Sequence, residues 1–489
     1  MMKTKTIQYF IWLCLACALV SCKDKWADHL GDGDAFDQKT LYDVVTSDAN
    51  FSAFTELLEQ SGYAEALKAS KNYTLIIPNN AAIATAKMQY DFADSAVVRS
   101  FVGYHLINSI YNVHEGTDTV RALNFRNKYV EFTRGELDGI VPISQNLIAS
   151  NGLYHVVNQA LEPLQNIFTL VNSQFSETAQ VEAINSFDTL YTEDDLIYFK
   201  SSPVWIAEVR RNMTMENKKF TYFVVDDENF DSEYAKLQPF FATPYEEGNT
   251  HRPDSTTTFF TKKALLRDFI VEGALDESDL IGELQSISGT RFHLDPANII
   301  SSHKASNGIV YRVKRIEYAL ADQIKEIKVV GTQPIGYKQN DKRGNIFFRD
   351  KRDVNGLPYT DIQIYDHKVT AFYAKYRVAG MNVVKYKVYG RAIMGLAGDP
   401  QTATFTQYVH FFDRTLTSVN EPDLYKKPVI NSEGNNDTRM AYEVQPLNHE
   451  EVYLGEITQD QFGNQLLLVM SNGTGPIILE YLRFVPIVQ

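Results

Sequence analysis

Cysteine is almost missing from this chain, and its few copies sit at one end. Of 489 residues only three are cysteines, Cys14, Cys17 and Cys22. The rest of the sequence therefore excludes disulfide bonds and thiolate metal sites. Tryptophan is equally scarce, with three copies, so the aromatic content comes from 28 tyrosines and 29 phenylalanines.

Positive charge is also in short supply. The 47 lysines and arginines are outnumbered by 61 acidic residues, which gives a formal net charge of −14. An acidic chain without a compensating Lys/Arg cluster repels phosphate backbones, so we expect no nucleic acid partner. After Cys22, no stretch reaches the roughly 20 apolar residues that span a bilayer. At this length we expect about two to four domains.

The amino-terminal residues have the pattern of an export leader. Lys3 and Lys5 precede a nearly unbroken apolar stretch over residues 7–20, and a secretory leader has an apolar region of roughly 7–15 residues. The stretch runs into LVSC, which resembles the lipobox of bacterial lipoproteins. The resemblance implies cleavage before Cys22 and lipid on its sulfur. Removing residues 1–21 takes away two lysines and leaves a charge of 45 − 61 = −16. A leader with an incidental cysteine is the alternative.

The residues from Lys23 onward read KDKWADHLGDGDAFDQ. A lysine and an aspartate directly after the lipid site resemble the surface-export signal of lipoproteins in the Bacteroides group, which implies a place on the outer face of the outer membrane. Asp32, Asp34 and Asp37 also raise the question of a calcium loop. Their spacing is wrong for an EF-hand, and no glutamate stands at the twelfth position. We therefore expect residues 22–40 to form a solvated tether without a metal.

Three motifs follow a stretch in which apolar residues recur with helical spacing, from Phe51 to Leu67. YTLIIPNNAAI predicts a strand ended by its proline, VVRSFVGYHLI carries a Tyr-His pair, and NGLYHVVNQALEP predicts a hairpin turn at Asn-Gly. Together they resemble the fasciclin-like domain over residues 41–163. Asn79 and Ile83 depart from the family pattern, in which Thr and Phe are usual. The matching positions are Thr74, Pro78, Asn80, Tyr104, His105, Asn151, Gly152, His155 and Val156.

The same motifs recur in altered form over residues 164–319. KKFTYFVVDDENF aligns with KNYTLIIPNNAAI, and SNGIVYRVKRIEYA aligns with SNGLYHVVNQALEP. LLRDFIVEGAL aligns with VVRSFVGYHLI, which places Phe269 under Phe101 and a Glu-Gly pair under the Tyr-His pair. We expect a second, divergent fasciclin-like domain without the Tyr-His site, and a long surface loop over residues 232–258.

His105 and His155 raise the question of catalysis or metal binding. They lie 50 residues apart, without the i, i+4 spacing or neighbouring carboxylate of a zinc site. The fasciclin-like resemblance implies that the Tyr-His pair organises the fold by packing and hydrogen bonding. No G-x-S-x-G, H-E-x-x-H or phosphate-binding loop occurs in the sequence. We therefore expect no catalytic residue, no metal and no cofactor.

Residues 320–489 differ in character. KVTAFYAKYRVAGMNVVKYKVYGRAIM predicts two strands around Gly380, with Tyr386 and Val388 on one face and Lys385 and Lys387 on the other. TATFTQYVHFF and GNQLLLVMS predict further strands, and no helical segment competes with them, which favours an antiparallel β-sandwich. The closing IILEYLRFVP resembles the final strand of galactose-binding-like sandwiches, which implies a carbohydrate-binding-like domain. We assign no ligand-binding residue in it.

The predicted fold is multidomain α+β, with two fasciclin-like α/β-wedge domains followed by an antiparallel β-sandwich. The predicted segments are a signal peptide (1–21), a tether (22–40), the two fasciclin-like domains (41–163 and 164–319) and the β-sandwich (320–489).

The combined resemblances imply a non-catalytic lipoprotein on the outer-membrane surface, an accessory or glycan-binding component of a TonB-dependent, starch-utilisation-like uptake complex. Its partners would be the transporter, the substrate-binding lipoprotein of that transporter, and a glycan. A cell-surface adhesin is the alternative. A glycan-degrading enzyme is a third reading, because a catalytic carboxylate pair cannot be located among 61 acidic residues.

Overall fold

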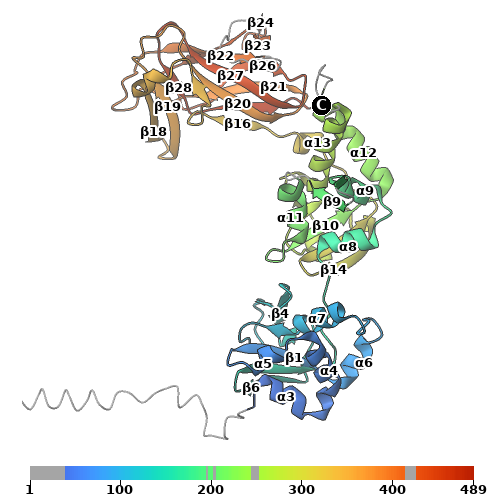
Figure 1. Ribbon diagram of the computed structural model, residues 1–489. Helices are drawn as coiled ribbons and strands as arrows, with labels where there is room; N and C mark the ends of the chain where they lie inside the picture. Colours follow the sequence, from blue (N-terminus) through green and yellow to red (C-terminus); the bar gives the residue numbers. More distant parts are fainter. Residues whose placement is uncertain (1–38, 194–195, 202–204, 244–252, 413–425, 489) are drawn as a thin grey trace, which may run out of the picture. The chain divides into compact units, whose positions relative to one another are not determined.

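The computed structural model describes residues 39–193, 196–201, 205–243, 253–412 and 426–488. The chain forms two compact units, which divide between Leu164 and Gln165 and are described separately (Figure 1). No helix in the described ranges is long and apolar enough to cross a membrane. The predicted leader, the lipid site Cys22 and most of the tether lie outside the described residues.

The first unit is built on a four-stranded sheet with the order β2-β1-β7-β6, here called the first mixed sheet. Its strands are β1 (Tyr73–Pro78), β2 (Leu106–Ile107), β6 (Ser144–Ala149) and β7 (Gly152–Val157). β1 and β7 run parallel, whereas the two outer pairs are antiparallel. Every residue of β1 is buried, as the unbroken apolar run YTLIIP predicts, and the strand ends at Pro78.

Helices pack against the first mixed sheet and bury the predicted apolar face. Phe51 and Phe54 are at most 6% exposed and share a core with Leu75 and Ile77 of β1. The helical segment is split by Gly62, whose φ of +75° ends α4 in the left-handed conformation. The helices are α3 (Leu41–Ser47), η1 (Ala49–Phe51), α4 (Ser52–Ser61), α5 (Ala64–Lys68), α6 (Asn80–Ala86) and α7 (Ser95–Tyr104). A small sheet completes the unit, with β3 (Val120–Leu123), β4 (Tyr129–Thr133) and β5 (Glu136–Leu137).

The second unit contains a sheet of the same form, with the order β11-β10-β15-β14, here called the second mixed sheet. Its strands are β10 (Phe220–Val224), β11 (Ile270–Glu272), β14 (Ile299–Ala305) and β15 (Gly308–Val313). In the parallel pairs, Tyr73 lies opposite Gly152 in the first sheet, and Phe220 lies opposite Gly308 in the second. The two registers therefore correspond at constant offsets of 220 − 73 = 147 and 308 − 152 = 156.

Helices and two short hairpins surround the second mixed sheet. The helices are α8 (Ile167–Gln174), α9 (Ala179–Asn185), η2 (Ile206–Arg210), α11 (Arg211–Thr214), α12 (Asp227–Leu237), η3 (Gln238–Phe241), α13 (Pro253–Asp268), η4 (Glu277–Leu280), η5 (Pro296–Asn298) and α14 (Leu320–Gln323). The hairpins are β8 (Asp188–Glu193) with β9 (Leu196–Ser201), and β12 (Glu283–Gln285) with β13 (Arg291–His293).

The prediction of a surface loop over residues 232–258 was wrong for the part that the structure describes. α12 continues to Leu237, η3 follows directly, and α13 begins at Pro253. Phe230, Glu233 and Leu237 recur at helical spacing and are buried. The polar residues between them hid this narrow apolar face in the sequence.

The residues after 326 form antiparallel sheets of six, five and three strands, coloured orange to red in Figure 1. In spatial order the six are β16 (Ile327–Val330), β29 (Tyr481–Pro486), β21 (Lys385–Arg391), β26 (Val452–Thr458), β23 (Val429–Asn431) and β24 (Asn436–Asp437). The five are β17 (Gly336–Tyr337), β20 (Tyr373–Met381), β27 (Gly463–Ser471), β22 (Phe405–Phe412) and β25 (Met440–Val444). The three are β18 (Ile346–Arg352), β19 (Pro358–Ile364) and β28 (Ile477–Leu479), with η6 (Asn340–Asn345) before β18.

Side chains from all three sheets share one core. Ile364 of β19, Tyr386 of β21 and Val409 of β22 are fully buried members of it. The alternation along β21 is as predicted, because Val388 is buried like Tyr386 whereas Lys385 is exposed. The closing run IILEYLRFVP was expected to be a single strand, and this was wrong.

The closing run forms two strands in different sheets, β28 and β29, which are separated by Glu480. The carboxylate of Glu480 accepts a hydrogen bond from Arg391 Nη1 at 2.7 Å. A continuous strand would have an apolar side chain at this position. Because the residues on both sides of Glu480 are mostly apolar, the apolar pattern alone did not show that the chain passes from one sheet to another here.

Asn151 fixes where the chain enters the first unit. Its Oδ1 accepts a hydrogen bond from the Leu41 N–H at 2.7 Å. Its Nδ2 donates to the carbonyl oxygens of Leu67 at 2.7 Å and Ala69 at 2.9 Å. One buried amide therefore holds the first residue of α3 and the end of α5 beside the β6–β7 turn.

Asn307 makes the corresponding bonds in the second unit. Its Oδ1 accepts from the Ile167 N–H at 2.8 Å, and its Nδ2 donates to the carbonyls of Met213 at 3.0 Å and Met215 at 3.1 Å. The helix that begins each unit is thus anchored in the same way.

The glycine after each asparagine allows the parallel strands to approach. A Cβ on Gly152 would lie 2.2 Å from the carbonyl oxygen of Tyr73, and one on Gly308 would lie 1.7 Å from that of Phe220. Both distances are far shorter than a carbon–oxygen contact allows. Each sheet therefore requires glycine at this position.

Replacing Gly152 tests this requirement. We expect Gly152→Ala to lower the free energy of unfolding of the first unit by roughly 2–4 kcal/mol, because β1 and β7 must separate to admit the methyl group. Hydrogen-exchange mass spectrometry on peptides from β1 and β7 measures this loss locally. Gly139→Ala is the control, since Gly139 also has a positive φ, +83°, but its Cβ would meet nothing within 4 Å. Equal losses in the two variants would contradict the close-approach argument.

Candidate functional site

Thr74 joins β1 to the segment that follows β2. Its hydroxyl donates to the carbonyl oxygen of Ser109 at 2.7 Å and accepts from the Tyr111 N–H at 2.8 Å. Thr74 is fully buried, so both bonds are made away from water. The role of this motif residue is to hold the fold together.

The two asparagines after β1 begin α6. Asn79 Oδ1 accepts from the Ala82 N–H at 2.9 Å, an N-cap bond that threonine also makes, so the departure from the family pattern keeps the cap. Asn80 Oδ1 accepts from the Ala53 N–H at 3.0 Å, and its Nδ2 donates to the carbonyl of Ala49 at 2.9 Å. Asn80 therefore ties α6 to η1 and α4.

His105 is fully buried and bonded to the main chain on both sides of its ring. Nδ1 lies 2.8 Å from the carbonyl oxygen of Phe101, and Nε2 accepts from the Leu161 N–H at 3.0 Å. These partners fit a neutral ring that carries its proton on Nδ1, and burial lowers the pKa of His105 to about 4. The neighbouring Tyr104 is also buried, and its hydroxyl lies 3.5 Å from the carboxylate of Asp138.

His155 is held in the same manner. Its Nε2 lies 3.0 Å from the carbonyl oxygen of Tyr111, and its Nδ1 accepts from the Asn146 N–H at 3.2 Å. Burial lowers the pKa of His155 to about 4. Since main-chain groups occupy the ring nitrogens of His105 and His155, a metal or a transferred proton at either ring would have to displace a bond that holds the fold.

The second mixed sheet repeats the threonine but not the histidine. Thr221 donates to the carbonyl of Gly273 at 2.8 Å and accepts from the Leu275 N–H at 2.9 Å, as Thr74 does in the first unit. The Glu-Gly pair therefore lies at the end of β11, with Glu272 as its last residue and Gly273 directly after it, and does not stand in the place of the Tyr-His pair.

This register corrects the sequence alignment of the helix before β11. Ile76 N–H donates to the carbonyl of His105, and Phe223 N–H donates to the carbonyl of Phe269, both at 3.0 Å. Phe269 thus occupies the place of His105, whereas the sequence alignment put it under Phe101. The error is four residues, about one helical turn, and an amphipathic pattern repeats after that distance.

The described residues show no arrangement for metal chemistry. No group of three or more His, Cys, Asp or Glu among them is placed to hold a metal ion. In the last sheets, Arg349 Nε donates to Asp361 at 2.8 Å and its Nη1 donates to Asp399 at 3.0 Å. These two buried carboxylates are therefore neutralised by a neighbouring cation.

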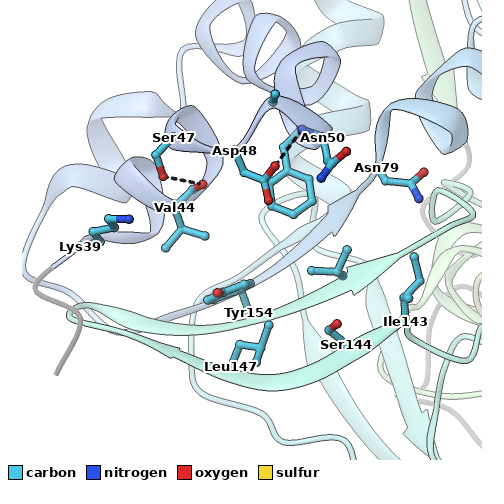
Figure 2. Close-up of a pocket in the computed structure, with 13 residues that line it drawn as sticks. Lys39, Val44, Ser47, Asp48, Asn50, Asn79, Ile143, Ser144, Leu147 and Tyr154 are labelled. Atoms are coloured by element: carbon cyan, nitrogen blue, oxygen red, sulfur yellow. Dashed lines mark hydrogen bonds between the residues drawn. The ribbon is translucent and has the colours of Figure 1, made fainter. Parts of the chain in front are cut away.

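A pocket of about 590 Å³ lies in the first unit, between the α3–η1 segment and the strands β6 and β7 (Figure 2). Figure 2 shows Tyr154, Leu147 and Ser144 on the strands, with Asp48 and Asn50 on the opposite wall. The lining residues are Lys39, Val44, Ser47, Asp48, Ala49, Asn50, Phe51, Asn79, Ile143, Ser144, Leu147, Tyr154 and Val156.

The pocket combines apolar surface with neutral polar groups. Val44 and Phe51 are buried, and Tyr154 is half-buried. Asp48 Oδ1 accepts from the Asn50 N–H at 2.9 Å, which fixes the turn between α3 and η1. One aspartate and one lysine line the pocket, and no histidine or cysteine is among its lining residues. This chemistry suits binding of an uncharged amphipathic ligand.

Sequence reasoning missed this pocket. Its residues come from three separate stretches, 39–51, Asn79 and 143–156, which the sheet and the α3–η1 turn bring together. The available signal was the alternation in GLYHVV, which places Tyr154 and Val156 on one face of β7. The sequence did not reveal that this part of the face is left uncovered.

Comparison with known proteins gives a family for part of the first unit. Residues 49–163 match the family model described as the fasciclin domain. No curated protein matches the sequence. Among solved structures, the chain is similar to a FAS1 domain pair from the insect cell adhesion molecule fasciclin I, with 14% identity over 57% of this chain and 100% of that chain, at a TM-score of 0.25.

Two other similar structures contain carbohydrate-binding modules. One is a family 35 carbohydrate-binding module from Clostridium thermocellum, with 14% identity over 33% of this chain and 98% of that chain, at a TM-score of 0.19. The other is the GH26-CBM35 beta-(1,4)-mannanase of Podospora anserina, with 9% identity over 34% of this chain and 28% of that chain, at a TM-score of 0.22.

The buried histidines predict how stability depends on pH. The pKa of His105 is about 4 in the folded chain and 6.5 in a model compound, so the unfolded chain binds the extra proton between these values. Stability is therefore complete above pH 6.5 and falls as pH drops toward 4, by roughly 2 kcal/mol at pH 5 for one such histidine.

We expect His105→Gln to remove about 2 kcal/mol of the stability difference between pH 7 and pH 5 in the first unit. Pulse proteolysis in urea, with peptides of α7 followed by mass spectrometry, measures this difference. His293→Gln, at an exposed histidine, is the matched control and should leave the stability difference between pH 7 and pH 5 unchanged. An unchanged pH dependence in His105→Gln would show that this ring does not carry the effect.

Proposed function

We propose that this chain, whose residues 49–163 match the fasciclin domain family, is a non-catalytic surface lipoprotein that recognises a glycan as part of a nutrient-uptake complex. The fasciclin match carries the proposal, because this domain is typical of cell-adhesion and surface-associated proteins. The two motif histidines support it, since their ring nitrogens bond the main chain.

The proposed architecture is two fasciclin-like domains, 41–163 and 164–319, followed by a β-sandwich of carbohydrate-binding type at 320–489. The equal strand order and register of the two mixed sheets support the second domain. The three antiparallel sheets with one shared core support the sandwich.

The proposed location is the outer face of the outer membrane, through lipid on Cys22. The LVSC motif and the following Lys-Asp pair support it. In this setting the partners are a TonB-dependent transporter and its substrate-binding lipoprotein. An adhesin is the second candidate function, and the fasciclin match itself favours it.

Affinity purification after mild detergent extraction tests the proposal. We expect the transporter and its substrate-binding lipoprotein to be recovered with the chain, and recovery of the chain alone counts against the uptake complex. Adhesion of cells to the purified protein without any soluble glycan ligand favours the adhesin. Release of reducing sugar by the purified protein would establish an enzyme.

The lipid anchor gives a separate prediction. We expect Cys22→Ala, in cells that lack the partner transporter, to move the protein from the membrane fraction to the soluble fraction, because each buried CH₂ of the lipid contributes about 0.8 kcal/mol and the variant carries no lipid. Cell fractionation and the mass of the amino-terminal peptide measure the change. Cys17→Ala is the matched control and should remain anchored, since Cys17 leaves with the leader. A Cys22→Ala protein that stays in the membrane fraction contradicts the anchor.

A further inference from the structure

The two mixed sheets allow the pocket to be compared with the same place in the second unit. The offsets of 147 for β1 and 156 for β7, together with the pairing of β6 and β14, fix the corresponding residues. The pairs are Asn79 with Asp226, Ser144 with Ser301, Leu147 with His303, Tyr154 with Val310, and Val156 with Arg312.

In the second unit the protein's own side chains contact one another at this place. Arg312 forms an ion pair with Asp226 and also donates to a neighbouring main-chain carbonyl. The ring of Phe175, just after α8, packs edge-on against His303 with centroids 5.4 Å apart. Val310 is fully buried. An arginine, a phenylalanine and a histidine therefore occupy space around these strands.

In the first unit the same positions hold smaller or uncharged groups. Val156 replaces the arginine, Asn79 the aspartate, and Leu147 the histidine, and the pocket of about 590 Å³ remains open there. The main chain also differs here, because the pairing of β6 with β7 shifts register between Ser144 and Leu147, whereas β14 pairs with β15 without a shift from Ser301 to Ala305. The open pocket therefore coincides with smaller or uncharged side chains at these positions and with the register shift in β6.

The open walls present hydrogen-bonding groups beside apolar surface. Asn79 uses Oδ1 to cap α6, and its Nδ2 has no partner among the described residues. Asp48 uses Oδ1 in its own turn, and its Oδ2 likewise has no partner within the described part of the chain. Tyr154 and Val156 are half-buried on the same face of β7, so an aromatic ring and an aliphatic group line the pocket together with these polar residues.

This combination fits a polyhydroxylated ring. The apolar C–H face of a pyranose packs on a tyrosine ring, while its hydroxyls bond to amide and carboxylate groups at the edge. The single aspartate and single lysine in the lining cancel, so the pocket has no net charge with which to bind an ionised group. An acidic chain with a charge of −14 also repels anionic sugars.

We propose that the pocket between α3–η1 and β6–β7 binds a pyranose unit of a neutral oligosaccharide, with Tyr154 as the stacking ring and Asn79 and Asp48 as hydroxyl partners. This assignment rests on the proposed glycan-recognition function and names the site that performs it in the first unit. The corresponding place in the second unit is closed by Arg312 and Asp226 and takes no ligand.

The decisive variant places the ion pair of the second unit at the corresponding positions of the first unit. Asn79→Asp with Val156→Arg recreates the pair of Asp226 and Arg312, and aspartate is a favourable residue at the N-cap position of α6. Ile148→Arg is the matched control. Ile148 lies next to Leu147 on β6, is 64% exposed and does not line the pocket, so this control adds the same cation on the neighbouring strand, outside the pocket. Tyr154→Leu removes the ring without filling the pocket and serves if the double variant fails to fold.

Calorimetric titration of the full-length protein with cellohexaose, mannohexaose, xylohexaose and maltohexaose measures binding. We expect at least one of these neutral probes to bind, the double variant to weaken that binding by at least about tenfold, and Tyr154→Leu to weaken it by about 2- to 10-fold. Ile148→Arg should bind like the unmodified protein. Thermal unfolding checks that each variant is folded.

Two results overturn the assignment and are distinguishable from each other. If a probe binds and both pocket variants bind it equally well, the glycan function stands but its site lies elsewhere in the chain. If none of the neutral probes binds the full-length protein, both the neutral-sugar assignment and the glycan-recognition function fail.

Discussion

A buried asparagine followed by a glycine is the constraint on which both mixed sheets depend. The side-chain oxygen and nitrogen of Asn151 both form hydrogen bonds with main-chain groups of α3 and of the end of α5. Gly152 then passes so close to β1 that no side chain fits. Asn307 and Gly308 repeat both features. An unpaired amide buried in either place would cost roughly 1–3 kcal/mol. The entry of the first helix, the β6–β7 turn and the parallel pairing are therefore fixed by one dipeptide.

The other motif residues differ in whether the second mixed sheet keeps the same residue type at their position. The threonine on the central strand keeps both of its bonds in each sheet, through Thr74 and Thr221. The histidine is exchanged, because Phe269 stands in the place of His105 and packs edge-on against Tyr318 with centroids 5.8 Å apart. A ring that accepts and donates to the main chain is thus replaced by one that only packs. A catalytic role is not needed to explain either residue.

The sequence predicted the parts of the fold that depend on unbroken or alternating apolar patterns. β1 is a continuous apolar run and is buried throughout, and β21 alternates as expected. The helix α12 was missed because only Phe230, Glu233 and Leu237 mark its buried face. The helix before β11 was aligned one turn out of place because periodicity cannot distinguish successive turns. The strand pairing, which periodicity does not contain, settled it.

The candidate site could not be predicted, for a different physical reason. A pocket is a property of what is left unfilled, and its walls come from residues about 100 positions apart, such as Asp48 and Tyr154. The comparison of the two mixed sheets supplies what the single sequence lacked, since Arg312 and Asp226 form an ion pair at the place in the second unit that corresponds to the pocket in the first. Asn79, Leu147 and Val156 line the pocket and differ in size or charge from their counterparts in the second unit, so those residues are where its function must be sought.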